Sequence, residues 1–471
     1  MVKRHMQNIS IPKFIKDIRF WILLFFVVRL VGITNPPLEL GHNWRQSFTA
    51  MVARNMVEQG PDLLHPKADY LGNSEGVIAS EFPIFNYLIY AVSKVFDYDH
   101  WYGRLINLIV SSFGLFYFYK ISRQLFNTRV AFNATLILTS SIWFAFSRKI
   151  MPDTFSISLL MIGAYGGIDY LQKSRISGLF AFFIFCTLGM LSKIPALSLF
   201  CAFAVVPVIK GLPKRNKLIL SLTALASVIV VLGWYFVWVP HLIEKYNYSL
   251  YESKGMIEGF YEVLPLLGPL AEKFYFSAFH SFVASLCFLI GVYYLVKKKS
   301  KILQLALIII TCVFCVFIVK TGTIFPTHNY YIIPFVPVMA LIASFSITKL
   351  PPKFSFILLA IILAEGIANQ QHDFKVPSEE TYKLELESLI LEHLTEEKLI
   401  IINGGPSPQD IYFAHRKGWS VQNEVLFEPL KLDSLKQLGG EYLIVNKHNL
   451  NSGFDAQGLV FENQDYSFYK L

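Results

Sequence analysis

The stretches ELGHNWRQSFTAMVARNMVEQGPDLLHP (39–66) and EFPIFNYLIY (81–90) follow the first hydrophobic segment and are separated by a polar run. The whole region 39–90 is too polar to span a bilayer, yet apolar residues recur in it at helical spacing. This pattern is typical of helices that lie at a membrane interface. We expect a loop with two surface helices that carries polar groups into a cavity among spanning helices. The polar groups are those of His42, Trp44, Arg45, Gln46, Arg54 and Glu81.

The composition indicates a polytopic membrane protein. The chain has 471 residues, of which 54% are hydrophobic and only 16% are charged, and its mean hydropathy is +0.47. A soluble protein of this length would carry more charge. The net charge of +9 comes from basic residues in short loops between apolar blocks, which suits the positive-inside rule better than binding to nucleic acid.

The apolar blocks predict about eleven membrane spans. The first resembles a signal peptide, but no small-x-small cleavage site follows it, so we expect it to be retained. A mainly α-helical bundle is therefore predicted. The blocks lie near 18–34, 101–119, 129–147, 152–171, 177–192, 194–210, 217–239, 278–296, 302–320, 328–347 and 353–370.

Loop charge predicts how the spans are oriented. If the N-terminus is cytoplasmic and 81–96 lies on the outer surface, the basic loops all fall on the cytoplasmic side. Counting 81–96 as a twelfth span reverses this agreement. The polar segments then converge on the outer face, where we expect the active site. The basic loops contain Lys120, Arg123, Lys173, Arg175, Lys210, Lys214, Arg215, Lys297, Lys349 and Lys353.

The composition changes to a soluble pattern from about residue 375. The segment 378–394 suggests an amphipathic helix, and 408–418 suggests a short helix that ends at Gly418. Strands are expected in EKLIIIN, EYLIVN, GLVFE and YSFYKL. We predict a membrane domain over 1–374 and a small extracytoplasmic α/β domain over 375–471, beside the site.

The five cysteines all lie in apolar blocks. Cys312 and Cys315 form a C-x-x-C pair, but no histidine or second pair lies near it in the sequence. Small apolar side chains in a helix bundle are therefore favoured over a redox or zinc site.

The sequence lacks recognisable nucleotide-binding motifs, which limits the class of donor that an enzyme of this kind could use. No GxGxxG, P-loop or DxD-like motif stands out in a soluble segment, and an outward-facing enzyme would meet no nucleotide-activated donor. A donor carried on a lipid could reach a cavity at the bilayer edge. It would need cations near its phosphate, a carboxylate near its acceptor and an apolar groove for its tail.

The chain resembles the GT-C superfamily of glycosyltransferases, in the branch of protein O-mannosyltransferases, lipid A aminoarabinose transferases and lipopolysaccharide sugar transferases. The resemblance implies polyprenyl-phosphate sugar donors, a cavity between the first outer loop and the bundle, and an outer C-terminal domain. It rests on HNWRQSFTAMVARNMVEQG, EFPIFNYL, WYGRLINLIVSSFGLFYFYKISRQLF, SRKIMPDTFSISLL, LSKIPAL and THNYYIIPFVP.

The resemblance implies roles for two residues and shows two departures. Asp153 matches an acidic residue of the family, and Lys193 matches a lysine that is implied to bind the lipid phosphate. Many relatives have an Asp-Glu pair where this chain has Arg45-Gln46, which leaves the first-loop carboxylate in doubt. Relatives often have Lys-Pro-Pro-Leu at 81–84, where this chain has EFPI.

Several candidate site residues could instead have ordinary structural roles. Asp153 and Glu81 could instead cap helices, and Lys193 could snorkel to the interface. Arg54 could contact lipid headgroups. The catalytic candidates are Asp153, Glu81, His42 and Glu39; the donor-phosphate candidates are Lys193, Arg148, Lys149 and Arg45; the substrate-binding candidates are Trp44, Gln46, His328 and Tyr331.

The sequence identifies no certain cofactor. Glu39, His42 and Glu81 match no known metal-ligand spacing, so no metal site is assigned and a divalent ion is left open.

These features predict a multi-pass glycosyltransferase of the plasma (inner) membrane with an extracytoplasmic site. It would transfer a sugar from a polyprenyl phosphate to a glycan, lipid or protein acceptor. The alternatives are a transporter or flippase of lipid-linked sugars, which would show internal repeats and broken helices, and an oligosaccharide ligase that uses lipid pyrophosphate.

Overall fold

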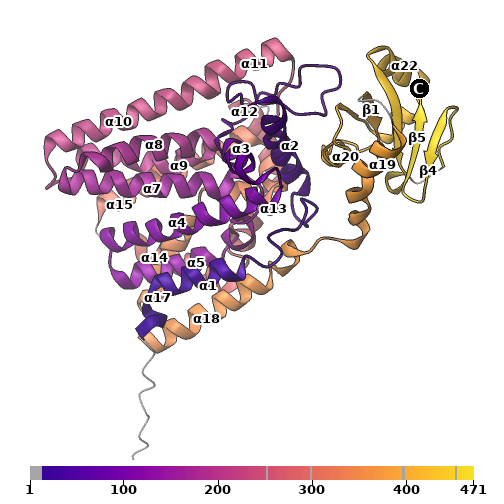
Figure 1. The fold of residues 1–471 in the computed structure, drawn as a ribbon. Helices are drawn as coiled ribbons and strands as arrows, with labels where there is room; N and C mark the ends of the chain where they lie inside the picture. The colour runs from indigo at the N-terminus through magenta and orange to yellow at the C-terminus, as the bar shows by residue number, and fades with distance from the viewer. Residues whose placement is uncertain (1–12, 251–252, 298–299, 395–397, 451–452) are drawn as a thin grey trace, which may run out of the picture.

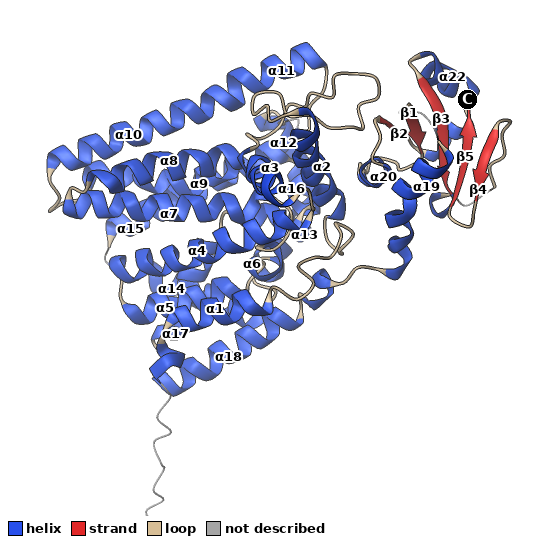
Figure 2. Ribbon diagram, in the orientation of Figure 1, coloured by secondary structure: helices blue, strands red, loops and turns tan. Residues whose placement is uncertain are grey.

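The computed structural model describes residues 13–250, 253–297, 300–394, 398–450 and 453–471. Most of the chain forms a bundle of helices that run in similar directions, and a small sheet domain lies beyond one end of it (Figures 1 and 2). The helices and loops of residues 39–96 lie at that same end, near the sheet domain (Figure 1). The predicted mainly helical class with a smaller α/β part is therefore observed.

The bundle is built from long apolar helices joined by short turns. Buried aromatic and aliphatic side chains from these helices form one large core. The bundle helices are α1 (Ile18–Val28), α4 (Trp101–Leu125), α5 (Thr128–Ser140), α7 (Pro152–Lys173), α8 (Ile176–Ser192), α9 (Leu197–Phe200), α10 (Lys214–Gly233), α14 (Phe282–Val296), α15 (Lys301–Thr321), α17 (Val336–Thr348) and α18 (Pro352–Ala368).

Short helices connect or extend these elements near the sheet-domain end. Two π-helical turns, Trp234–Trp238 and Lys273–Ser277, and several 3-10 turns interrupt the longer helical paths. The short α-helices are α6 (Trp143–Phe146), α11 (Val239–Tyr246), α12 (Met256–Val263), α13 (Leu267–Glu272) and α16 (Ile324–Thr327).

The described residues contain fewer full-length spans than the eleven predicted. Four helices are long and apolar enough to cross a membrane, or up to six if two bent pairs are each one span; five further apolar helices have 10–17 residues. The prediction counted apolar blocks, and several blocks are broken. The block 328–347, for example, contains a 3-10 turn at Asn329–Ile332 before α17 begins at Val336.

The two predicted helices of the first loop are present, as α2 (Asn43–Gln59) and α3 (Ile84–Phe96). Twelve residues of α2 are buried against other parts of the protein. Arg54 contacts no headgroup in this arrangement. Its guanidinium donates to the Tyr412 carbonyl oxygen at 2.9 Å and pairs with Asp69 at 3.3 Å. The apolar spacing of α2 therefore serves packing against α3 and the sheet domain.

The C-terminal part is a five-stranded mixed sheet in the order β2-β1-β3-β5-β4. β1 pairs in parallel with β2 and β3, whereas β5 pairs antiparallel with β3 and β4. The predicted strands are present, but Gly418 begins a strand that the sequence did not predict. The elements are α19 (Leu386–His393), β1 (Leu399–Ile402), α20 (Gln409–Ala414), β2 (Gly418–Ser420), α21 (Asn423–Leu426), α22 (Pro429–Gln437), β3 (Gly440–Asn446), β4 (Leu459–Glu462) and β5 (Tyr466–Lys470).

The sheet domain is tied to the first loop by backbone hydrogen bonds. The Gly72 N–H donates to the Gly418 carbonyl oxygen at 2.8 Å, and the Gly418 N–H donates to the Asp69 carbonyl oxygen at 3.0 Å. Near them, His415 lies between two carboxylates, Glu58 of α2 at 2.7 Å and Glu387 of α19 at 2.5 Å. The domain thus covers the loop that carries the predicted polar residues.

The segment 378–394 is only partly the helix that its pattern predicted. A 3-10 helix runs over Ser378–Glu385, and α19 follows it. The cysteines are all free, and Cys312 and Cys315 are exposed on α15. Within the described ranges no group of three or more His, Cys, Asp or Glu side chains is placed to hold a metal ion. The C-x-x-C pair therefore gains no metal partner there.

Candidate active site

Close packing of α7 and α8 brings two of the predicted site residues together. A Cβ on Gly166 would lie 2.6 Å from the Gly178 carbonyl oxygen, and a Cβ on Gly189 would lie 2.8 Å from the Ser156 carbonyl oxygen. Only glycine allows the two backbones to approach so closely. Asp153 lies in the first turn of α7 and Lys193 directly follows α8, so this contact holds the two side chains at one end of the helix pair.

Lys193 lies between two carboxylates. Its Nζ is 3.7 Å from an oxygen of Asp153 and 3.8 Å from an oxygen of Glu81. All three side chains are buried. Arg45 of α2 binds Glu81 in a direct ion pair. The structure therefore joins four of the predicted residues, from the first loop, α7 and the end of α8, in one cluster with two positive and two negative charges.

Neither acid occupies the N-cap position of a helix. The residue that caps α7 is Met151, and the residue that caps α3 is Pro83. Glu81 lies before that cap, and its carboxylate instead forms ion pairs with Arg45 and Lys193. Asp153 stands in the first turn of α7, where the helix dipole also favours a negative charge, but its ion-pair partner is Lys193.

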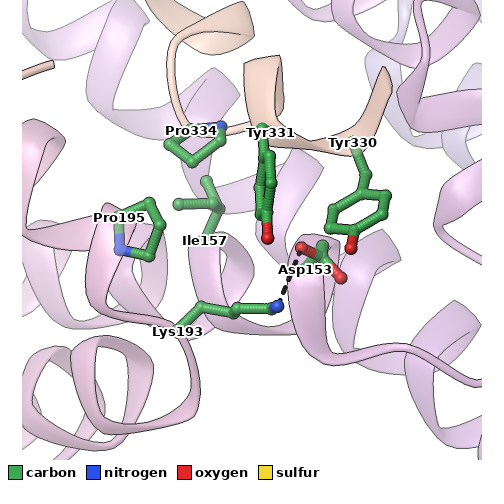
Figure 3. Close-up of a pocket in the computed structure, with 7 residues that line it drawn as sticks. All are labelled: Asp153, Ile157, Lys193, Pro195, Tyr330, Tyr331 and Pro334. Carbon is green, nitrogen blue, oxygen red and sulfur yellow. Dashed lines mark ion pairs between the residues drawn. The ribbon is translucent and has the colours of Figure 1, made fainter. Parts of the chain in front are cut away.

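A small cavity lies at the Asp153–Lys193 pair. Figure 3 shows the Lys193 side chain extending to Asp153, with the hydroxyl groups of Tyr330 and Tyr331 turned toward the pair. The Lys193 Nζ also lies 5.4 Å from the centre of the Tyr330 ring. The remaining wall is apolar and consists of Ile157, Pro195 and Pro334. One end of the cavity is thus charged and the other end is apolar.

The charge state of Glu81 follows from its neighbours. Burial opposes its ionisation, but the positive charges of Arg45 and Lys193 outweigh burial and hold the pKa of Glu81 below its usual value. Its Oε2 atom has no hydrogen-bond partner among the described residues. The same holds for Oδ2 of Asp153. Each acid therefore keeps one oxygen for another molecule.

Histidines and aromatic rings form the neighbouring wall. The rings of His42 and His328 stack with centres 5.5 Å apart, and His42 meets the edge of Tyr330 at 4.7 Å. The Trp44 ring lies 6.4 Å from His328. Burial, with His328 and nearby lysines, lowers the pKa of His42 to about 3. His42 is therefore neutral near pH 7 and is a weak proton acceptor.

The other predicted candidates lie in a separate cluster. Glu39 is fully buried, and its carboxylate binds Arg104 and Arg148. The Lys149 ammonium donates to the carbonyl oxygens of Leu40 at 2.8 Å and Gly41 at 3.0 Å. These contacts hold the first loop onto the bundle. The structure therefore does not bring Glu39, Arg148 or Lys149 to the cavity.

Gln46 also acts on the fold. Its side-chain oxygen accepts a hydrogen bond from the Ile150 N–H at 3.2 Å, and the side chain is fully buried. This contact fixes the turn before α7 rather than reaching the cavity. Arg29, which directly follows α1, is likewise fully buried and donates hydrogen bonds to the Ser147 hydroxyl and the Phe25 carbonyl oxygen.

Sequence reasoning missed the apolar half of the cavity. Ile157 lies one helical turn after Asp153, and Pro195 lies two residues after Lys193, so both could have been found from their spacing to the charged residues. Pro334 carried no such signal.

Comparison with known proteins confirms the predicted resemblance to GT-C membrane glycosyltransferases. Residues 80–238, which include Glu81, Asp153 and Lys193, match the family described as dolichyl-phosphate-mannose-protein mannosyltransferase. No curated protein sequence matches the chain.

Three solved structures share the fold. ArnT from Cupriavidus metallidurans bound to undecaprenyl phosphate is 12% identical, with a TM-score of 0.64 over 95% of this chain and 97% of that chain. The archaeal oligosaccharyltransferase AglB from Archaeoglobus fulgidus is 12% identical, with a TM-score of 0.59 over 91% and 69% of the two chains. Arabinofuranosyltransferase AftD from Mycobacteria is 11% identical, with a TM-score of 0.56 over 96% and 40%.

Proposed function

We propose that this chain is an integral-membrane glycosyltransferase that moves one sugar from a polyprenyl phosphate to a hydroxyl group of a glycan, lipid or protein on the outer side of the membrane. The observation that carries the proposal is the position of Lys193. It stands between two carboxylates at the charged end of a cavity whose other end is apolar. A lipid phosphate donor needs a cation beside its phosphate and an apolar groove for its tail. The acceptor needs a carboxylate that can take its proton.

The reaction can be written on these groups. The acceptor oxygen attacks the anomeric carbon of the sugar while a carboxylate, Asp153 or Glu81, takes the hydroxyl proton. The bond between the anomeric carbon and the phosphate oxygen breaks, and its electron pair stays on the phosphate. Lys193 stabilises the negative charge of the leaving polyprenyl phosphate. Tyr331 and His328 would line the sugar between these groups.

The likeness to ArnT supports the donor class, because that structure is bound to undecaprenyl phosphate. The family that matches residues 80–238 is described by a dolichyl-phosphate sugar donor. Both are lipid monophosphates.

The test is transfer by the purified full-length protein in lipid nanodiscs with radiolabelled polyprenyl-phosphate hexoses and pentoses. Release of polyprenyl phosphate with sugar transfer supports the enzyme. Uptake of the lipid-linked sugar into sealed vesicles without bond cleavage would identify a flippase. Cleavage of polyprenyl-pyrophosphate donors alone would identify an oligosaccharide ligase.

A further inference from the structure

A π-helical turn lies at the end of the bundle that carries the first loop. α10 continues through this turn, Trp234–Trp238, into α11 as one long helical path, and the α11 end of the path lies near the first loop (Figure 1). π-helical turns are rare and occur frequently at functional sites. This one has the sequence WYFVW, and the sequence analysis assigned no role to its residues.

Two adjacent aromatic side chains of the turn donate hydrogen bonds to backbone carbonyl oxygens of other segments. The indole N–H of the buried Trp234 donates to the Ser80 carbonyl oxygen at 3.1 Å. The Tyr235 hydroxyl donates to the Leu191 carbonyl oxygen at 2.8 Å. Ser80 directly precedes Glu81 in the chain, so the first of these bonds fixes the backbone beside that carboxylate.

The Leu191 carbonyl oxygen connects the segment of Glu81 to the segment of Lys193. Leu191 lies two residues before Lys193, and its oxygen also accepts a hydrogen bond from the Phe82 N–H at 3.1 Å. Phe82 directly follows Glu81, and its ring meets the Trp234 indole edge-on, with the ring centres 5.0 Å apart. Both neighbours of Glu81 in the chain are therefore held by the turn or by the residue to which the turn bonds.

The helices alone do not fix the distance between Glu81 and Lys193. Glu81 lies in the loop before α3, and Lys193 lies between the end of α8 and the 3-10 turn Ile194–Ala196. The contact of α7 with α8 places Lys193 against Asp153, but Glu81 belongs to the first loop. The 3.8 Å separation of Glu81 and Lys193 therefore depends on the bonds between their two segments. A misplacement of about 1 Å can lower the rate of an enzyme about 100-fold.

We infer that the π-turn Trp234–Trp238 positions the Lys193 ammonium relative to the Glu81 carboxylate, with Trp234 and Tyr235 as the positioning residues. Neither side chain is among the residues that line the cavity at Lys193 in the described structure, so both act through the backbone. The inference rests on the proposed function, since it gives the position of Lys193 a role in binding the donor phosphate. If the turn only packed α10 against the bundle, its hydrogen bonds would affect stability without a specific effect on that binding.

Tyr235→Phe tests the inference, because it removes one hydroxyl and keeps the ring. In the full-length protein in nanodiscs, hydrogen–deuterium exchange should become about fivefold faster in the peptide that contains Phe82, the change expected for the loss of one hydrogen bond. Trp238→Phe is the matched control. It lies in the same turn, but its indole N–H donates to the Leu64 carbonyl oxygen at 2.9 Å, in a segment without either charged group. Exchange at Phe82 should then change by less than twofold.

Binding of undecaprenyl phosphate gives the second readout. Tyr235→Phe should weaken the affinity about fivefold to tenfold in the native background. In the Lys193→Ala background it should change the affinity by less than twofold, because no ammonium is left to position. A merely structural role would give the same fold-change in both backgrounds.

The two measurements separate this inference from the proposed function. Unchanged exchange at Phe82, or equal fold-changes in affinity in the two backgrounds, overturns the positioning role. Faster exchange at Phe82 in a protein that binds no undecaprenyl phosphate keeps the positioning role and rejects the proposed donor. Should Tyr235→Phe not fold, Trp234→Phe removes the bond to Ser80 and decides the question by the same two measurements.

Discussion

Lys193 is positively charged and lies beside both carboxylates of the site. Its ammonium lies within 4 Å of Asp153 and Glu81, and its removal would leave Asp153 without that cation in a buried place. We expect Lys193→Ala to weaken binding of undecaprenyl phosphate by about tenfold to a hundredfold, because a charged hydrogen bond to phosphate contributes about 1.5–3 kcal/mol. Lys193→Arg should recover part of the affinity. Titration of the lipid into nanodiscs measures both, with exposed Lys94→Ala as control.

Isosteric substitutions test whether one of the two carboxylates acts as the base. Asp153→Asn and Glu81→Gln keep the shape of each side chain and remove its ability to take a proton. If these acids supply the base, the single-turnover rate should fall by about 10² to 10⁴ in at least one variant. Unchanged protein yield and thermal stability serve as controls for folding. Full activity in both variants would rule out the assignment of the base to this pair.

The sequence led to the central residues but not to their roles in the fold. Asp153, Glu81 and Lys193 stand at the ends of apolar blocks, and a charge at that position is visible in the sequence. Arg148 and Lys149 show the same signal. Their side chains turn instead to Glu39 and to the carbonyl oxygens of residues 40–41. A linear pattern does not say which partner a buried charge will find.

At the scale of elements, the contact of α7 with α8 sets the geometry of the Asp153–Lys193 pair. A side chain at Gly178 would meet the Gly166 carbonyl oxygen, 2.6 Å from its Cβ. We therefore expect Gly178→Leu to destabilise the protein by about 1–3 kcal/mol and to lower transfer activity by displacing α8. Gly268→Leu is the matched control, since nothing lies within 4 Å of a Cβ there. Thermal unfolding and transfer rates check this; equal behaviour of the two variants would contradict it.

The contact between α2 and the sheet domain should depend on pH. Glu387 and Glu58 raise the pKa of His415 to about 9, against about 6.5 when unfolded. The stabilisation is therefore complete below about pH 6.5 and is lost as the pH rises through about 9. Because His415 is partly exposed, we expect no more than about 1–2 kcal/mol.

His415→Asn tests this contact, since asparagine also tolerates the positive φ of 49° at this position. The difference in thermal stability between the native protein and His415→Asn should be largest near pH 6 and should shrink toward pH 10. A difference that stays constant over this range would show that the imidazolium does not hold the domain in place.

At the scale of the whole molecule, the sequence predicted the architecture better than the number of spans. Long apolar runs are easy to see, but the position of a break inside them is not, as in the 3-10 turn Asn329–Ile332 before α17. The sequence also did not show how far α2 is buried: twelve of its residues are covered, in part by the sheet domain, where Arg54 meets Tyr412. The sheet domain that covers α2 lies about 350 residues later in the chain, so the local sequence pattern of α2 cannot reveal it.

Loop charge predicts which side of the membrane the site faces. α4 starts at the end of the bundle that carries the first loop, so its last turn and the turn between α7 and α8 lie at the opposite end. That turn holds Lys173 and Arg175, and the positive-inside rule assigns it to the cytoplasm. The sheet domain and the Lys193 cluster should then face outward.

Two single cysteines decide the orientation, in the protein that carries Cys312→Ser and Cys315→Ser. Lys431→Cys replaces an exposed residue of α22 in the sheet domain, and Lys173→Cys replaces one at the end of α7. In intact spheroplasts, an impermeant maleimide should label the first without permeabilisation and the second only after it. The reverse pattern would put the cavity on the cytoplasmic side. There nucleotide-activated sugars are within reach, and the enzyme would not need a lipid-carried donor.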